Sequence, residues 1–134
     1  MTTHTGGCHC GAVRYEVSGE PDHVALCHCV DCRRSAGAPM VSFAAFPEDA
    51  LRVTQGQPVE YHSTGATVRS FCGRCGSSLF YRNEEFLPGL VDFHTATLDN
   101  PEALPPTAHI QTAERLDWMA EAHSLPMFER YPSQ

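Results

Sequence analysis

Seven cysteines in three clusters constrain the fold of this 134-residue chain more than any other feature. They form a Cys-X-Cys pair at Cys8 and Cys10, a group of three at Cys27, Cys29 and Cys32, and a Cys-X-X-Cys pair at Cys72 and Cys75. An odd number of cysteines fits a disulfide framework poorly, whereas clustered thiols in a reducing compartment are typical metal ligands. We therefore expect a fold built around metal sites.

The rest of the sequence fits one globular domain. Residues 1–7 are short and polar, and no stretch approaches the roughly 18 apolar residues that span a bilayer. We expect a cytoplasmic protein without a signal peptide or membrane contact. Hydrophobic residues make up 42% of the chain and charged residues 19%, which is typical of one globular domain. Together with the cysteine clusters, this predicts a single zinc-binding domain over residues 1–134.

The charge balance excludes one class of partner. The chain has 16 acidic and 9 basic side chains and a net charge of -7. Seven zinc-bound thiolates and two zinc ions would bring the net charge to about -10. Such a surface repels phosphate backbones, so we expect no nucleic-acid binding.

Short alternating or apolar runs dominate, which predicts a mostly β fold with little helix. The expected strands cover residues 12–17, 24–26, 40–46, 51–54, 59–62, 68–71, 78–82 and 90–98. Residues 55–58 contain glycine and proline and predict a hairpin turn between the fourth and fifth of these strands. A short helix is expected near residues 113–122.

The Cys-X-X-Cys pair is typical of a zinc knuckle. Gly73 and Gly76 allow a tight turn in which backbone N–H groups point at the sulfurs of Cys72 and Cys75. A redox role is less favoured because no βαβ pattern surrounds the pair. In an extended segment Cys8 and Cys10 would present both sulfurs on one face. The four cysteines would then form a closed structural zinc site.

Cys27, Cys29 and Cys32 remain as ligands of a second zinc. Three protein ligands with an open fourth position are typical of catalytic zinc. The sequence equally allows a histidine to close the site as Cys3His. Exchanging the two Cys-X-Cys pairs between the sites fits the spacing less well, because Cys32 would become a fifth ligand at the knuckle.

The residues next to the cysteines are candidates for supporting roles. His9 and His28 lie between ligands, and we expect them to point away from the metals. Arg33 and Arg34 directly follow the second site. Together with Arg14, they are candidates for holding an anionic substrate, although a solvated surface position is the favoured interpretation.

The segments CHCGAVRYEV, CHCVDCRRSAGAP and FCGRCGSSLFYR, followed by a Leu98–Pro101 turn, His109 and Trp118, resemble one family closely. This is the glutathione-dependent formaldehyde-activating enzyme family, which includes centromere protein V. The resemblance covers residues 7–128. It implies a β-tent fold of sheets around two zinc ions per chain. It also implies that Cys8, Cys10, Cys72 and Cys75 hold the structural zinc and Cys27, Cys29 and Cys32 the catalytic zinc.

The implied activity is the addition of glutathione to formaldehyde, the reverse of a carbon–sulfur lyase reaction that splits S-hydroxymethylglutathione. Other thiols or aldehydes remain open as substrates. The zinc would bind the thiol and lower its pKa. Two other functions remain open, a zinc-stabilised protein-binding module and a thiol-redox sensor at the second cysteine group. The sequence assigns no role to His109, Asp99 or Trp118 and no oligomeric state.

Overall fold

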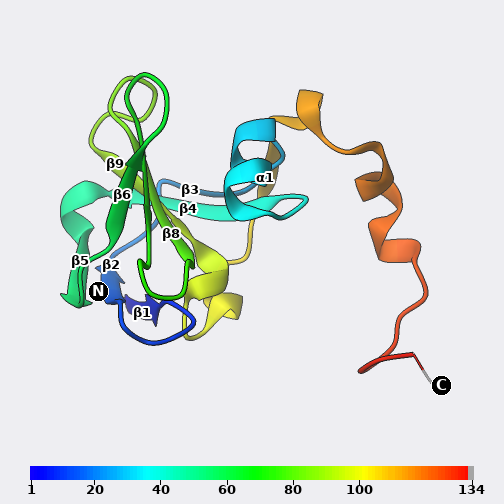
Figure 1. Cartoon of the computed structure of the whole chain (residues 1–134), viewed down its shortest axis with the longest axis horizontal. Coiled ribbons are helices and arrows are strands. Elements are labelled where there is room, and N and C mark those ends of the chain that lie inside the picture. The colour runs from blue at the N-terminus through cyan, green and yellow to red at the C-terminus, as the bar shows by residue number, and fades with distance from the viewer. Residues whose placement is uncertain (133–134) are drawn as a thin grey trace.

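The computed structural model describes residues 1–132, in which two β-sheets pack against each other (Figure 1). The smaller sheet has the order β1 (Thr3–Gly7), β2 (Arg14–Ser18) and β5 (Leu51–Gln55). The larger sheet has the order β10 (Ala108–Ile110), β3 (His23–Cys27), β4 (Val41–Pro47), β9 (Leu90–His94), β8 (Ser78–Asn83), β7 (Thr67–Phe71) and β6 (Val59–His62). The β10–β3 pair is parallel and the other described pairs are antiparallel.

Helical structure is short and lies at the connections. The α-helix α1 spans Val30–Ala36 and follows β3. Short 3-10 helices cover Glu48–Ala50, Thr95–Thr97, Pro101–Ala103, Thr112–Glu114 and Asp117–Ser124. The predicted mostly β fold, with antiparallel sheets and cysteine clusters, is confirmed. The predicted domain end at residue 134 lies outside the described residues.

The main core lies between the two sheets. Tyr15 and Val17 of β2 face Phe46 and Phe93 of the larger sheet, and all four are at most 1% exposed. The Tyr15 ring meets the Phe93 ring at a centroid distance of 5.6 Å. Burial of aromatic side chains of this size stabilises the fold by several kcal/mol in all, at about 25 cal/mol per Å².

The opposite face of the larger sheet is chemically different. Adjacent residues in the strand registry share a face, and His23, Ala45, Asp92, Tyr81 and Arg69 form one row across five strands. Val41 and Phe43 of β4 lie on this face near Cys27. Together with Cys27 and with Cys32 of α1, they form a second, smaller apolar cluster. The sheet therefore has a core face and a polar, cysteine-bearing face.

Two predicted connections are wrong. Residues 55–58 do not close a hairpin, because β5 pairs with β2 in the smaller sheet while β6 pairs with β7 in the larger one. The strand expected over residues 90–98 ends at His94. The Thr95 hydroxyl there donates to the Ser42 hydroxyl at 2.6 Å and the Thr97 hydroxyl to the His94 carbonyl at 2.7 Å, which favours a 3-10 turn over a strand.

Strand β1 and helix α1 are absent from the sequence-based prediction. Strand β1 is a polar edge strand whose glycines give no alternating apolar pattern. Helix α1 is only 7 residues long, too short for a helical period, but it carries cap signals. The Cys29 sulfur accepts from the Cys32 N–H at 3.2 Å, and Gly37 ends the helix with a φ of 64°.

Residues beyond β10 run away from the two sheets (orange to red in Figure 1). Two 3-10 turns replace the short helix expected near residues 113–122. Most side chains of this segment are exposed, including those of Trp118, Met127 and Phe128. No helix within residues 1–132 is long and apolar enough to cross a membrane.

Candidate metal and thiol site

Four cysteines from distant parts of the chain form the first cluster. The sulfurs of Cys8, Cys10, Cys72 and Cys75 all lie within 4.8 Å of one another. The Cys8–Cys10 distance is 3.6 Å and the Cys10–Cys72 distance is 3.8 Å. A tetrahedral ion with metal–sulfur bonds of about 2.3 Å, as for zinc, places its sulfurs about 3.8 Å apart. The donor set therefore fits a four-thiolate metal ion.

A turn, rather than an extended segment, brings Cys8 and Cys10 together. The Gly11 N–H donates to the Cys8 carbonyl at 3.1 Å, which closes the turn directly after β1. The expectation of an extended segment is therefore wrong at this point. The Val13 N–H also donates to the Cys8 sulfur, at 3.2 Å.

The knuckle has the predicted backbone geometry. The N–H groups of Arg74 and Cys75 donate to the Cys72 sulfur at 3.4 and 3.5 Å. Gly76 has a φ of 83°, which side chains other than glycine rarely adopt. The hydroxyl and backbone N–H of Ser77 lower the pKa of the exposed Cys75 thiol to about 5. Such donors stabilise a thiolate, the form that binds a metal.

The second cluster is built by the end of β3 and the start of α1. Cys27 is the last residue of β3, Cys29 is the N-cap of α1, and Cys32 lies in the first turn of the helix. Cys27 and Cys32 sulfurs are 3.8 Å apart, and all three sulfurs lie within 4.8 Å of one another. The separation again matches that expected around a tetrahedral ion.

The thiols of this cluster have pKa values shifted in opposite directions. The contact with Cys32 lowers the pKa of Cys27, while the contact with Cys27 together with burial raises the pKa of Cys32. Burial also raises the pKa of Cys29. Three thiolates at this spacing repel one another, so a cation is needed to hold all of them ionised.

The second cluster opens into a cavity of about 370 Å³. Its lining combines the three cysteines with a mainly apolar wall, one histidine and one carboxylate: His23, Cys27, Cys29, Cys32, Phe43, Tyr81, Phe86, Leu87, Asp92, Ile110 and Gln111. Within residues 1–132, no histidine or carboxylate joins the three sulfurs as a fourth ligand. The described part of the chain thus gives no support to a histidine-closed site and leaves the fourth position facing the cavity.

The two histidines between cysteines lie differently. His9 is exposed. His28 is fully buried, and its Nε2 lies 2.9 Å from Nδ1 of His109. Burial and then His109 lower the pKa of His28. His109, to which the sequence assigned no role, therefore links β10 to the cysteine-bearing connection after β3.

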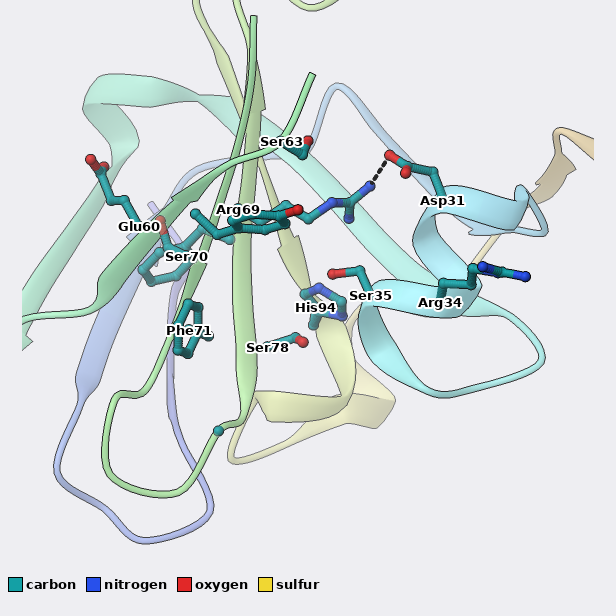
Figure 2. A pocket seen from close by; sticks show the side chains of 13 residues that line it. Asp31, Arg34, Ser35, Glu60, Ser63, Arg69, Ser70, Phe71, Ser78 and His94 are labelled. Atoms are coloured by element: carbon teal, nitrogen blue, oxygen red, sulfur yellow. Dashed lines mark hydrogen bonds and ion pairs between the residues drawn. The ribbon is translucent and has the colours of Figure 1, made fainter. Parts of the chain in front are cut away.

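Arg69 of β7 is a site residue that the sequence analysis missed. It is buried and donates to Asp31 at 2.8 Å (Figure 2). It also lies 3.7 Å from the Cys32 sulfur. Its guanidinium also lies over the Tyr81 ring at 4.9 Å. Burial opposes its charge, but Asp31 and Cys32 outweigh that effect and raise its pKa. The sequence signal that could have located Arg69 is that it is the one charged residue of the predicted strand over residues 68–71.

Arg69 separates the cysteine cavity from a second cavity of about 670 Å³. Figure 2 shows His94, Ser35 and Arg34 around this second cavity, next to α1. Burial and then the nearby Arg69 charge lower the pKa of His94 to about 4. No cysteine of residues 1–132 lines it. Arg69 and His94 in its wall contact Cys32 and Phe43, respectively, which line the cysteine cavity.

The three arginines expected near an anionic substrate lie outside the cysteine cavity. Arg33 donates to the His28 carbonyl at 3.4 Å, and Arg34 lines the second cavity. Arg14 lies in the smaller sheet, where it pairs with Asp99 with Nη1 3.0 Å from Oδ1. Arg14 and Asp99 thus form a connection between β2 and the turn after β9.

Known proteins are similar to this chain in sequence and architecture. The family model described as glutathione-dependent formaldehyde-activating enzyme matches residues 3–114. A curated protein of Halomonas elongata, whose name provisionally gives the same description, is 30% identical over 123 residues, covering 85% of this chain and 78% of that protein. A crystal structure of a Rhodobacter sphaeroides protein is 27% identical with a TM-score of 0.64, covering 78% of this chain and 98% of that one. The chain belongs to the glutathione-dependent formaldehyde-activating enzyme family.

Proposed function

We propose that this protein is a carbon–sulfur lyase-type enzyme that joins a thiol to a small aldehyde, with glutathione and formaldehyde as its substrates. In the joining direction the thiol sulfur bonds to the carbonyl carbon, the carbon–oxygen π bond opens, and the thiol proton is transferred to the oxygen. The product is S-hydroxymethylglutathione, and the lyase reaction is the reverse. Family membership supports the substrates, and the open three-cysteine cavity supports the chemistry.

The observation that carries the proposal is the difference between the two clusters. In the first, four sulfurs complete a tetrahedral set, while in the second three sulfurs face a cavity of about 370 Å³. We infer zinc at both, with Cys8, Cys10, Cys72 and Cys75 as structural ligands and Cys27, Cys29 and Cys32 as ligands of the reactive ion. Bound there, zinc supplies a positive charge that favours the thiolate form of an incoming thiol.

The chain's own residues have three tasks in this reaction. The three cysteines hold the reacting end of the cavity, and α1 fixes two of them on one helical turn. Phe43, Phe86 and Leu87 supply apolar lining beside the thiol–aldehyde adduct. Phe43 is buried, whereas Phe86 is 75% exposed. Arg69, beside the Cys32 sulfur, offsets part of the thiolate charge. Arg33 and Arg34 remain candidates only for the outer, solvent-facing part of an anionic substrate.

The experiment that tests this function compares Cys29→Ser with the wild-type protein. Serine is a favoured N-cap, so this substitution keeps the helix start while removing one thiolate. Exchange between glutathione, ¹³C-formaldehyde and their adduct is followed by NMR against the uncatalysed rate. We expect the wild-type protein to accelerate exchange, and Cys29→Ser to lose that acceleration together with one metal ion per chain.

The matched control is Ser77→Ala, because the Ser77 hydroxyl contacts Cys75 of the other cluster at 3.3 Å. It is expected to exchange at the wild-type rate. Wild-type activity in a folded Cys29→Ser protein would remove the three-cysteine cavity from the reaction.

A further inference from the structure

The cysteine cavity has a second polar end, formed by Asp92 of β9 and His23 of β3. The Asp92 side chain is 8% exposed, and its Oδ1 has no hydrogen-bond partner among the described residues. His23 Nε2 lies 3.9 Å from that oxygen, too far for a hydrogen bond. The carboxylate therefore lies in the wall of the cavity with an acceptor unused.

The strand registry explains how these two groups meet. Ala45 of β4 pairs with His23 on one side and with Asp92 on the other. Its methyl group is too small to separate the two longer side chains. Cys27 is four positions after His23 along β3, so this end of the cavity is about 13 Å from the cysteine end, measured along the strand.

A buried carboxylate without partners is energetically costly and calls for a donor or a cation. Burial raises the pKa of Asp92 to about 6, so at neutral pH Asp92 is negatively charged in most molecules. No arginine or lysine of residues 1–132 lines this cavity to supply a countercharge. His23 also lines this cavity and, when protonated, offsets part of the Asp92 charge, but at 3.9 Å it leaves Oδ1 without a hydrogen bond. A donor on a ligand can supply that bond.

We propose that Asp92 binds the ammonium group at the amino-acid end of the thiol substrate while the substrate sulfur reaches the three cysteines. This inference rests on the proposed function and narrows its substrate class to thiols that carry a free amino-acid head group remote from the sulfur. Glutathione has such a group in its γ-glutamyl residue. His23, next to Asp92, can donate from its ring to the carboxylate of the same head group.

Alternative occupants fit this end of the cavity less well. A carboxylate alone would meet Asp92 as a like charge, at a cost in a poorly solvated site. A purely apolar ligand would leave the Asp92 oxygen unpaired. The zwitterionic head group provides a donor for Asp92 and an acceptor for His23 at once.

The test compares glutathione with N-acetylglutathione, which keeps the thiol and both carboxylates but lacks the ammonium charge. Isothermal titration calorimetry of the protein purified without chelators gives the dissociation constant of each. We expect the wild-type protein to prefer glutathione by about 10- to 100-fold, the range expected for a charged hydrogen bond. Asp92→Asn is expected to lose that preference by weakening glutathione binding alone.

Asp22→Asn is the matched control, because Asp22 contacts the Nδ1 of the same His23 at 3.2 Å but does not line the cavity. It is expected to keep the wild-type preference. Equal binding of both thiols by the wild-type protein, or an unchanged preference in Asp92→Asn, would overturn this inference while leaving the proposed function standing. Failure of the wild-type protein to bind either thiol would overturn both. Far-ultraviolet circular dichroism verifies that each variant is folded.

Discussion

Replacing Arg69 with methionine is expected to weaken metal binding at the three-cysteine cluster without unfolding the protein. Methionine keeps most of the buried aliphatic volume but removes the charge 3.7 Å from the Cys32 sulfur. At an effective dielectric constant of about 20, full charges at that distance attract by about 4.5 kcal/mol. That value is an upper figure, because Asp31 carries the opposite charge beside Arg69.

The Asp31 contribution can be bounded from the structure. Its carboxylate bonds to Arg69 at 2.8 Å, so it lies no farther than about 6.5 Å from the Cys32 sulfur and repels a thiolate there by at least about 2.5 kcal/mol on the same scale. The ion pair as a whole therefore stabilises the thiolate by at most about 2 kcal/mol. Arg69→Met removes the attraction and leaves the Asp31 charge, so the expected loss lies between about 2 and about 4.5 kcal/mol, which corresponds to about 30-fold or more weaker metal binding.

Competition with a chromophoric zinc chelator measures this affinity. Arg82→Met is the matched control. Like Arg69, Arg82 pairs with a carboxylate, that of Glu48 at 2.9 Å, and lies over an aromatic ring, that of Phe80 at 6.0 Å, but it contacts none of the described cysteines. It is expected to bind metal like the wild-type protein. Asp31→Asn should act in the opposite direction and tighten binding. The electrostatic reasoning is refuted if Asp31→Asn and Arg69→Met weaken binding equally, because the pair would then act only by holding α1 in place.

Three further predictions concern stability. Cys72→Ser is expected to lower the midpoint of thermal unfolding far more than Cys29→Ser, because Cys72 is 1% exposed in the main core; differential scanning calorimetry with and without a chelator checks this. Tyr15→Phe is expected to cost about 1 kcal/mol in urea unfolding by removing the hydroxyl that lies 2.8 Å from the Thr97 hydroxyl. Arg14 lowers the pKa of Asp99 to about 2. The ionised Asp99 therefore stabilises the fold above the unfolded pKa of about 3.9, and this stabilisation is lost as the pH falls toward 2. In Asp99→Asn, the free energy of unfolding should depend less on pH between about 4 and 2.

The cysteine groups were predictable from sequence because metal ligands are recognised by residue type and local spacing. Spacing alone divided the seven cysteines into the same two groups that the fold brings together. Most strands were also predictable, because apolar and alternating runs determine which residues can be buried. The geometry of Cys8 and Cys10 was not, since a turn and an extended segment both bring alternate sulfurs together.

The non-cysteine residues of the site could not be located because strand order is a long-range property. Asp92 stands between Val91 and Phe93, and Arg69 stands in the strand before the knuckle. Each is a charged residue in a buried strand, which signals a special environment. Only the order β3-β4-β9-β8-β7 shows that both belong to the face that carries Cys27. The wrong hairpin at residues 55–58 has the same cause, since local turn residues do not reveal which sheet the next strand joins.

The two clusters differ in their mechanical coupling to the fold. Cys8 and Cys72 belong to the main core between the sheets, so a metal there joins the smaller sheet to the β7–β8 turn. Cys27 and Cys32 belong to a separate small cluster that joins β3 to α1. Loss of the first metal would therefore loosen the larger sheet, on whose other face the cavity is built. Loss of a metal from the second cluster would release only α1 and its neighbours, so the three-cysteine cavity depends on the four-cysteine cluster much more than the reverse.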